Sequence, residues 1–64
     1  MLGQVRMYNQ KKGFGFIYGD DGKDYFVPYC NIDIPSRSLS VGYTVEFTAE
    51  KNNRGYVASN VRLI

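Results

Sequence analysis

The chain has 64 residues, a net charge of +2, one cysteine and no histidine. A chain of this length forms one small domain, because it buries only ~60% of the surface that its unfolded form exposes. A lone Cys30 cannot form a disulfide within the chain, and without histidine the sequence lacks the usual zinc ligands and the imidazole of acid–base catalysis. We therefore expect no metal, no cofactor and no enzymatic activity.

No stretch of the sequence approaches the ~18 consecutive apolar residues that a membrane-spanning helix needs. The first residues also lack the charged and then apolar layout of a signal peptide. The sequence therefore predicts a cytoplasmic protein that does not act at a membrane.

Turn-forming residues recur about every eight to twelve positions, and no segment carries apolar residues at helical spacing over a dozen positions. This pattern predicts an all-β domain with strands at residues 3–9, 14–18, 24–29, 43–51 and 56–63. Turns are predicted between most of them, at residues 9–13, 19–22 and 52–55. A closed or nearly closed five-stranded antiparallel barrel would remove the exposed edges of such a sheet.

The second predicted strand places Phe14, Phe16 and Tyr18 on one face and Gly15 and Ile17 on the other, because side chains alternate along a strand. Two readings of this strand are open. Phe14 and Phe16 are either core residues or members of an exposed aromatic face, with Gly15 allowing a close backbone approach on the opposite side.

The third predicted strand favours the exposed face. If Val27 points inward together with Tyr25, Phe26 and Pro28 point outward, and Tyr29 lies at the end of the strand. Residues 30–42 are then predicted as a connecting loop with one helical turn near Asn31. Cys30, as a small apolar side chain, is expected to be buried or half-buried.

Alternation in the last two strands predicts further core positions. In the fourth strand these are Val45, Phe47 and Ala49. In the fifth they are Val57 or Ala58, followed by Val61 and Leu63. With Tyr25 and Phe47 assigned to the core, several of the six Tyr and four Phe residues must still lie on the surface, because a core of this size cannot enclose ten rings.

An exposed aromatic face with cations nearby is typical of proteins that bind single-stranded nucleic acid. Unpaired bases stack on the rings, and Lys and Arg contact the phosphates. Arg6, Lys11, Lys12 and Arg54 are expected on or near this face. The acidic residues at 20, 21 and 24 are interpreted as ordinary turn residues rather than as a catalytic group.

The sequence also carries a longer pattern that includes these residues. It contains Gly3-Gln4-Val5-Arg6, Lys12-Gly13-Phe14-Gly15-Phe16-Ile17, Asp24-Tyr25-Phe26-Val27 and Asn60-Val61. This pattern resembles the cold-shock domain along essentially the whole chain, residues 1–64, and its two ribonucleoprotein motifs match residues 12–17 and 25–29. The resemblance implies an OB-fold barrel that binds single-stranded DNA or RNA.

The resemblance also implies roles for individual residues. Base stacking falls on Phe14, Phe16, Phe26 and Tyr29, phosphate contact falls on Arg6, Lys12 and Arg54, and Asp24 would accept a hydrogen bond from a base. Four features depart from the family pattern: Met7 replaces a tryptophan, Tyr8 a phenylalanine and Pro28 a histidine, and the loop at residues 33–38 is about one residue shorter and lacks an aromatic residue. Because Met and Pro have no aromatic face, we expect weaker binding than in a typical member or a shifted base preference.

The expected nucleic-acid-binding residues are therefore Arg6, Met7, Tyr8, Lys12, Phe14, Phe16, Tyr18, Asp24, Phe26, Pro28, Tyr29 and Arg54. The expected function is that of an RNA chaperone or a regulator of transcription or translation, acting as a monomer or weak homodimer and with no small-molecule substrate. Two points stay open: whether DNA or RNA is the ligand, and whether the same barrel is instead a protein-interaction module. With two to four phosphate contacts, the logarithm of affinity should fall against the logarithm of salt concentration with a slope of about −1.5 to −3.

Overall fold

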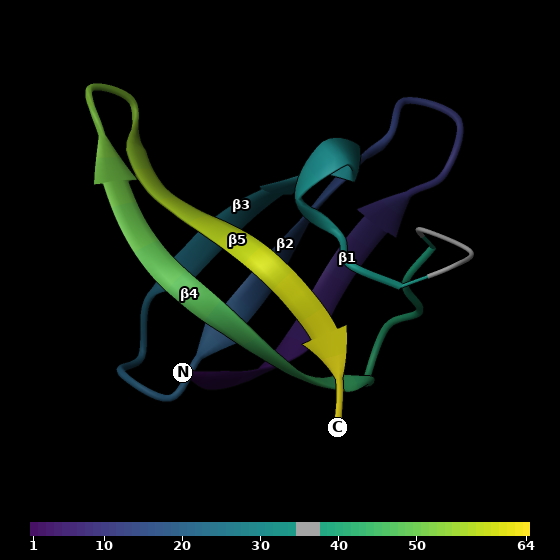
Figure 1. Ribbon diagram of the computed structural model, residues 1–64, viewed down its shortest axis with the longest axis horizontal. Coiled ribbons are helices and arrows are strands. Elements are labelled where there is room, and N and C mark those ends of the chain that lie inside the picture. Colours follow the sequence, from purple (N-terminus) through teal and green to yellow (C-terminus); the bar gives the residue numbers. More distant parts are fainter. Residues whose placement is uncertain (35–37) are drawn as a thin grey trace.

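In the computed structural model, which describes residues 1–34 and 38–64, five strands form one closed barrel (Figure 1). The strands are β1 (Leu2–Asn9), β2 (Phe14–Gly19), β3 (Asp24–Pro28), β4 (Thr44–Asn52) and β5 (Gly55–Leu63), and a short 3-10 helix, η1, spans Tyr29–Asn31. The predicted strands and the predicted helical turn are therefore confirmed to within one or two residues. In the predicted loop at 33–38, residues 35–37 lie outside the described residues. Within the described ranges, no helix has the length and apolar character needed to cross a membrane.

The barrel closes in the order β1-β2-β3-β5-β4, with β4 returning to β1. Four of the neighbouring pairs are antiparallel, whereas β3 and β5 run parallel and meet where Phe26 lies opposite Val57. One parallel pair is unavoidable, because an odd number of strands cannot alternate in direction all the way around a closed ring. The predicted five-stranded barrel is thus confirmed, with this one pair differing from the antiparallel arrangement.

The core fills the inside of the barrel with side chains from every strand. The buried apolar residues are Val5, Ile17, Tyr25, Val27, Ile32, Leu39, Val45, Phe47, Ala58 and Val61. Tyr25 and Phe47 are confirmed as core residues. Of the two residues left open for the core in β5, Val57 and Ala58, it is Ala58 that is buried. Ile32 and Leu39 come from the segment after η1, so residues predicted only as a connecting loop also close the core.

Three burial predictions are wrong. Ala49 is exposed because the β4–β5 hairpin extends beyond the barrel, where residues 48–54 are all exposed. Leu63 pairs with Val45 but lies at the last position of β5 and remains exposed. Cys30 is exposed because it lies within η1, none of whose residues is buried.

Candidate nucleic-acid interface

The outer face of β2 and β3 carries three rows of paired side chains. Phe14 lies opposite Pro28, Phe16 opposite Phe26, and Tyr18 opposite Asp24. Directly opposite residues of an antiparallel pair project from the same face of the sheet, so all six side chains share the outer surface. The predicted outward direction of Phe26 and Pro28 follows directly from this register.

Three phenyl rings form the centre of this face, and we call Phe14, Phe16 and Phe26 the aromatic platform. Their ring centroids are 6.5 Å apart for Phe14 and Phe16, 5.9 Å for Phe14 and Phe26, and 5.8 Å for Phe16 and Phe26. These separations lie in the range of favourable ring pairs, so the rings support one another. Phe26 is 37% exposed and the other two are half-buried, which leaves aromatic surface available to a ligand.

The opposite side of β2 explains why the platform faces outward. Ile17 is fully buried in the core, and Gly15 packs directly against β1. A side chain at Gly15 would collide with the carbonyl oxygen of Met7 and with the ring of Tyr8. Because this inner face already belongs to the core, the reading of Phe14 and Phe16 as core residues is excluded.

A β-bulge in β1 decides which of its residues reach the platform. Val5 pairs with Ile17 and Met7 pairs with Phe16, so Arg6 is an extra residue without an opposite partner in β2. Arg6 and Met7 are consequently both exposed on the outer face, with Met7 beside Phe16. Tyr8 points inward and packs against the core, which separates it from the platform.

Arg6, in the bulge of β1, contacts the row of the outer face that is formed by Tyr18 and Asp24. Its Nε lies 3.4 Å from the Asp24 carboxylate, and its guanidinium lies 4.7 Å from the ring centre of Tyr18. More than half of the Arg6 side chain is exposed, so this ion pair contributes little stability and can exchange for another anion. Arg6, Tyr18 and Asp24 therefore form one polar end of the aromatic face.

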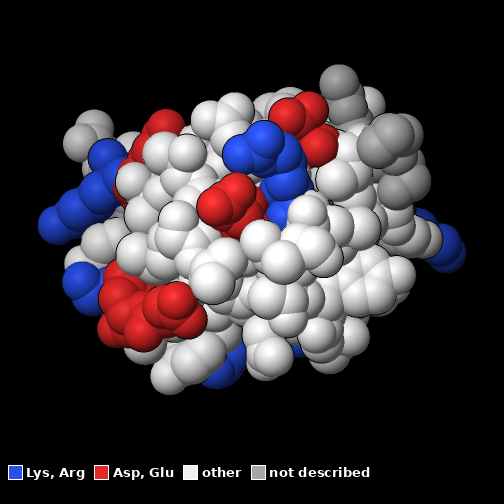
Figure 2. Space-filling view, turned by 60° about the horizontal axis from the view of Figure 1, so that its bottom comes forward, with Lys and Arg blue, Asp and Glu red and all other residues white. Residues whose placement is uncertain are grey.

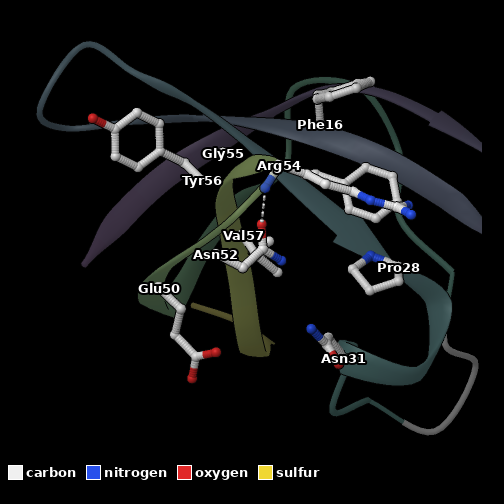
Figure 3. Close-up of a pocket in the computed structure, with 10 residues that line it drawn as sticks. Phe16, Pro28, Asn31, Glu50, Asn52, Arg54, Gly55, Tyr56 and Val57 are labelled. Carbon is white, nitrogen blue, oxygen red and sulfur yellow. Dashed lines mark hydrogen bonds between the residues drawn. The ribbon is translucent and has the colours of Figure 1, made fainter.

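The other end of the face opens into a groove of about 650 Å³ beneath the β4–β5 hairpin. Phe16, Phe26 and Pro28 line one side, and Arg54 extends over the same space from the hairpin (Figure 3). The backbone N–H of Arg54 donates to the Asn52 side chain at 2.9 Å, which fixes the turn. The structure thus brings one predicted cation directly to the platform.

Tyr29 and Lys12 lie at the loop that joins β1 to β2. The Tyr29 N–H donates to the carbonyl oxygen of Gly13 at 2.7 Å, and the Lys12 N–H donates to the Asn9 side chain at 3.1 Å. Tyr29 and Lys12 are both exposed. Tyr29 is near enough to Tyr8 that, after burial, it is the second cause of a raised Tyr8 pKa.

The sequence analysis missed the residues that complete the groove. These are Asn31, Glu50, Asn52, Gly55, Tyr56 and Val57. The parallel pairing of β3 with β5 brings these residues to the platform. The alternation of side chains within a single strand does not reveal which strands are neighbours, so it could not predict this pairing. Glu50 adds a negative charge, and its carboxylate accepts a hydrogen bond from the Ser59 hydroxyl at 2.9 Å.

Acidic and basic side chains alternate on the face drawn in Figure 2, so that face is not uniformly basic. Figure 2 shows a face on which acidic and basic side chains both occur and much of the surface is uncharged. The second ion pair in the described part of the chain joins Arg62 to Glu46 at 3.3 Å. No group of three or more His, Cys, Asp and Glu residues within residues 1–34 and 38–64 could hold a metal ion.

Comparison with known proteins agrees with this geometry. The profile of the family described as "'Cold-shock' DNA-binding domain" matches residues 1–64. A cold shock-like protein of Thermotoga maritima is 35% identical over 65 residues, which cover 100% of this chain and 98% of that protein. The cold shock-like protein CspG of Escherichia coli K12 is 46% identical over 63 residues, which cover 95% of this chain and 90% of that protein. The cold shock-like protein CspC of Bacillus cereus is 44% identical over 62 residues, which cover 95% of each chain.

Proposed function

The chain belongs to the cold-shock domain family, and on that premise we propose that it binds single-stranded DNA or RNA by stacking unpaired bases on the aromatic platform. Cold-shock domains are nucleic-acid-binding domains and not enzymes. The observation that carries the stacking mechanism is the outward cluster of Phe14, Phe16 and Phe26 on paired strands. Residues 1–64 would act as one binding domain.

Stacking can supply a large part of the free energy of a micromolar affinity. Each base on an aromatic ring contributes ~1–3 kcal/mol, so three rings contribute ~3–9 kcal/mol, whereas micromolar binding requires about 8 kcal/mol. Arg54 at the groove, Arg6 at the bulge and Lys12 in the β1–β2 loop are the proposed phosphate contacts. Tyr29 and Pro28 would extend the stacking surface at the end of β3.

The polar end of the face suits recognition of a base edge. Asp24 offers an acceptor, and a hydrogen bond from a base can replace its exposed ion pair with Arg6, which leaves Arg6 available for a phosphate. We place the protein in the cytoplasm as a monomer or weak homodimer. It would hold RNA open as a chaperone or regulate transcription or translation.

The test measures, by fluorescence anisotropy at low salt, the affinity of the protein for a labelled oligothymidine of about six nucleotides. Phe16→Ala and Phe26→Ala should each weaken binding roughly 5- to 150-fold, the equivalent of one lost stacking contact. Tyr43→Ala is the matched control, because Tyr43 is an exposed ring outside both the platform and the groove. A duplex of the same length should bind far more weakly than the single strand.

Two results would contradict the proposal. One is unchanged affinity in both phenylalanine variants while their spectra show an intact fold. The other is no measurable affinity of the unsubstituted chain for any homopolymer, which would favour a protein partner for the platform.

A variant that should bind the oligothymidine more tightly provides a second, independent test of the stacking mechanism. Met7 lies beside Phe16 on the outer face, where an aromatic ring would enlarge the stacking surface. Met7→Trp should therefore tighten binding roughly 5- to 150-fold, and the new indole reports the contact by its fluorescence.

A further inference from the structure

A second cluster of cations and an aromatic ring lies next to the platform and is not part of it. Lys23 comes from the β2–β3 turn, Lys51 from β4 and Tyr56 from β5. The Nζ atoms of Lys23 and Lys51 lie 4.8 and 5.6 Å from the ring centre of Tyr56. Two lysines far apart in the sequence are thus held at one ring.

The ring that gathers these lysines is firmly supported from inside. Tyr56 packs against the core, and its ring centroid lies 5.5 Å from that of Tyr25, which in turn lies 5.0 Å from Phe47. Cation–π contacts of about 0.5–1 kcal/mol orient flexible lysine side chains without neutralising them. The two ammonium groups are therefore held near the ring.

The nearby carboxylates form no close ion pair with these lysines in the described part of the chain, and Asp21 acts on Lys23 only at longer range. Within the described part of the chain, no carboxylate oxygen lies within 4.0 Å of either ammonium group. Asp21, on the same turn as Lys23, accepts hydrogen bonds from the Tyr25 hydroxyl and from the backbone N–H of Lys23. Two positive charges near one ring repel each other, and an anion bound close to both would relieve that repulsion.

This cluster continues the groove rather than standing apart from it. Tyr56 and Arg54 both line the groove, and in Figure 3 the Tyr56 ring points away from Phe16 and Arg54 on the other side of Gly55. Gly55 leaves this passage open, because no atom lies within 4 Å of the position that a Cβ would occupy there. A strand held at Arg54 can therefore run over Gly55 to Tyr56.

We propose that Lys23, Lys51 and Tyr56 form a second phosphate site, which takes the sugar–phosphate backbone of a single strand just beyond the last base stacked on the platform. The inference rests on the proposed function, because the platform supplies the strand. The site requires a phosphodiester anion and no particular base. It would make affinity depend on the length of the oligonucleotide.

The test compares oligothymidines of about four and about eight nucleotides, within the range of site sizes known for OB-folds. In the unsubstituted chain, the longer strand should bind more tightly and show a steeper salt dependence. Lys23→Gln and Lys51→Gln should each reduce the salt slope for the longer strand by about 0.7, and the double variant by about 1.4, with no change for the shorter strand.

Arg62→Gln is the matched control, because it removes one positive charge that pairs with Glu46 outside the groove. The inference is overturned if the lysine variants bind both lengths as the control does, in which case the proposed function still stands. If neither length binds the unsubstituted chain, the proposed function and this inference fail together. Tyr56→Phe should behave like the unsubstituted chain, because the ring, and not its hydroxyl, holds the lysines.

Discussion

Tyr25 links the core to the turn that carries Lys23. Its ring is buried beside Phe47, while its hydroxyl donates a hydrogen bond of 2.5 Å to the Asp21 carboxylate. This hydrogen bond, followed by burial, raises the pKa of Tyr25 from 10.0 to about 12. The same hydrogen bond lowers the pKa of Asp21 below its ordinary value of 3.8.

The two pKa shifts predict opposite dependences of stability on pH. Asp21 stabilises the fold above its ordinary pKa of 3.8, and this stabilisation is lost as the pH falls through its lower folded-state pKa. Tyr25 stabilises the fold below 10.0, and this stabilisation is lost as the pH rises through about 12. Tyr25→Phe should lower the urea midpoint at neutral pH and weaken both declines. Urea midpoints that run parallel to those of the unsubstituted chain over the whole pH range would contradict this account.

Individual residues show where the sequence was sufficient. Phe14, Phe16 and Phe26 were placed correctly because β2 and β3 pair without interruption, so a period of two holds along both. Tyr8 was grouped with them by resemblance alone, and it points into the core. The platform was thus predictable from alternation, whereas the direction of the β1 residues was not.

At the level of elements, two β-bulges interrupt the regular alternation of side chains. Arg6 is the extra residue in β1, and Asn60, with a φ of 52°, is the extra residue in β5. Each bulge shifts the alternation by one residue, so Ala58 and Val61 are both buried although they are three positions apart. Neither bulge has a composition signal strong enough to predict it from the sequence.

The segment after η1 contributes to the core more than a loop does. Ile32 forms an isolated parallel bridge with Val61, and the Asp33 N–H donates to the Val61 carbonyl oxygen at 2.7 Å. Leu39 is only 4% exposed. The sequence analysis missed this because the apolar residues of the segment follow no regular period.

Two leucines provide a matched test of that role. Leu39→Ala should lower the free energy of unfolding by ~2–5 kcal/mol, because it leaves a cavity in the core. Leu63→Ala should cost less than about 1 kcal/mol, because Leu63 is 47% exposed. Urea unfolding measures both, and similar losses for the two variants would mean that the segment does not close the barrel. A fold of this size has only ~3–10 kcal/mol in total, so Leu39→Ala would leave it close to unfolding.

For the whole molecule, the balance of charge decides what kind of binding is expected. The sequence has eight Lys and Arg residues and six Asp and Glu residues, and the groove itself is lined by Glu50 as well as Arg54. Few phosphates can then be neutralised, so the proposed function requires most of the binding free energy to come from stacked bases. The slight excess of positive charge is compatible with nucleic-acid binding only if the aromatic platform is the main contact.

The salt dependence of affinity tests this claim most directly. The affinity for an oligothymidine of about six nucleotides is measured by anisotropy over a series of salt concentrations, and its logarithm is plotted against the logarithm of salt concentration. Stacking on the platform with two to four phosphate contacts predicts a slope of about −1.5 to −3. A slope near −6 would mean that phosphate contacts dominate, and it would contradict the account.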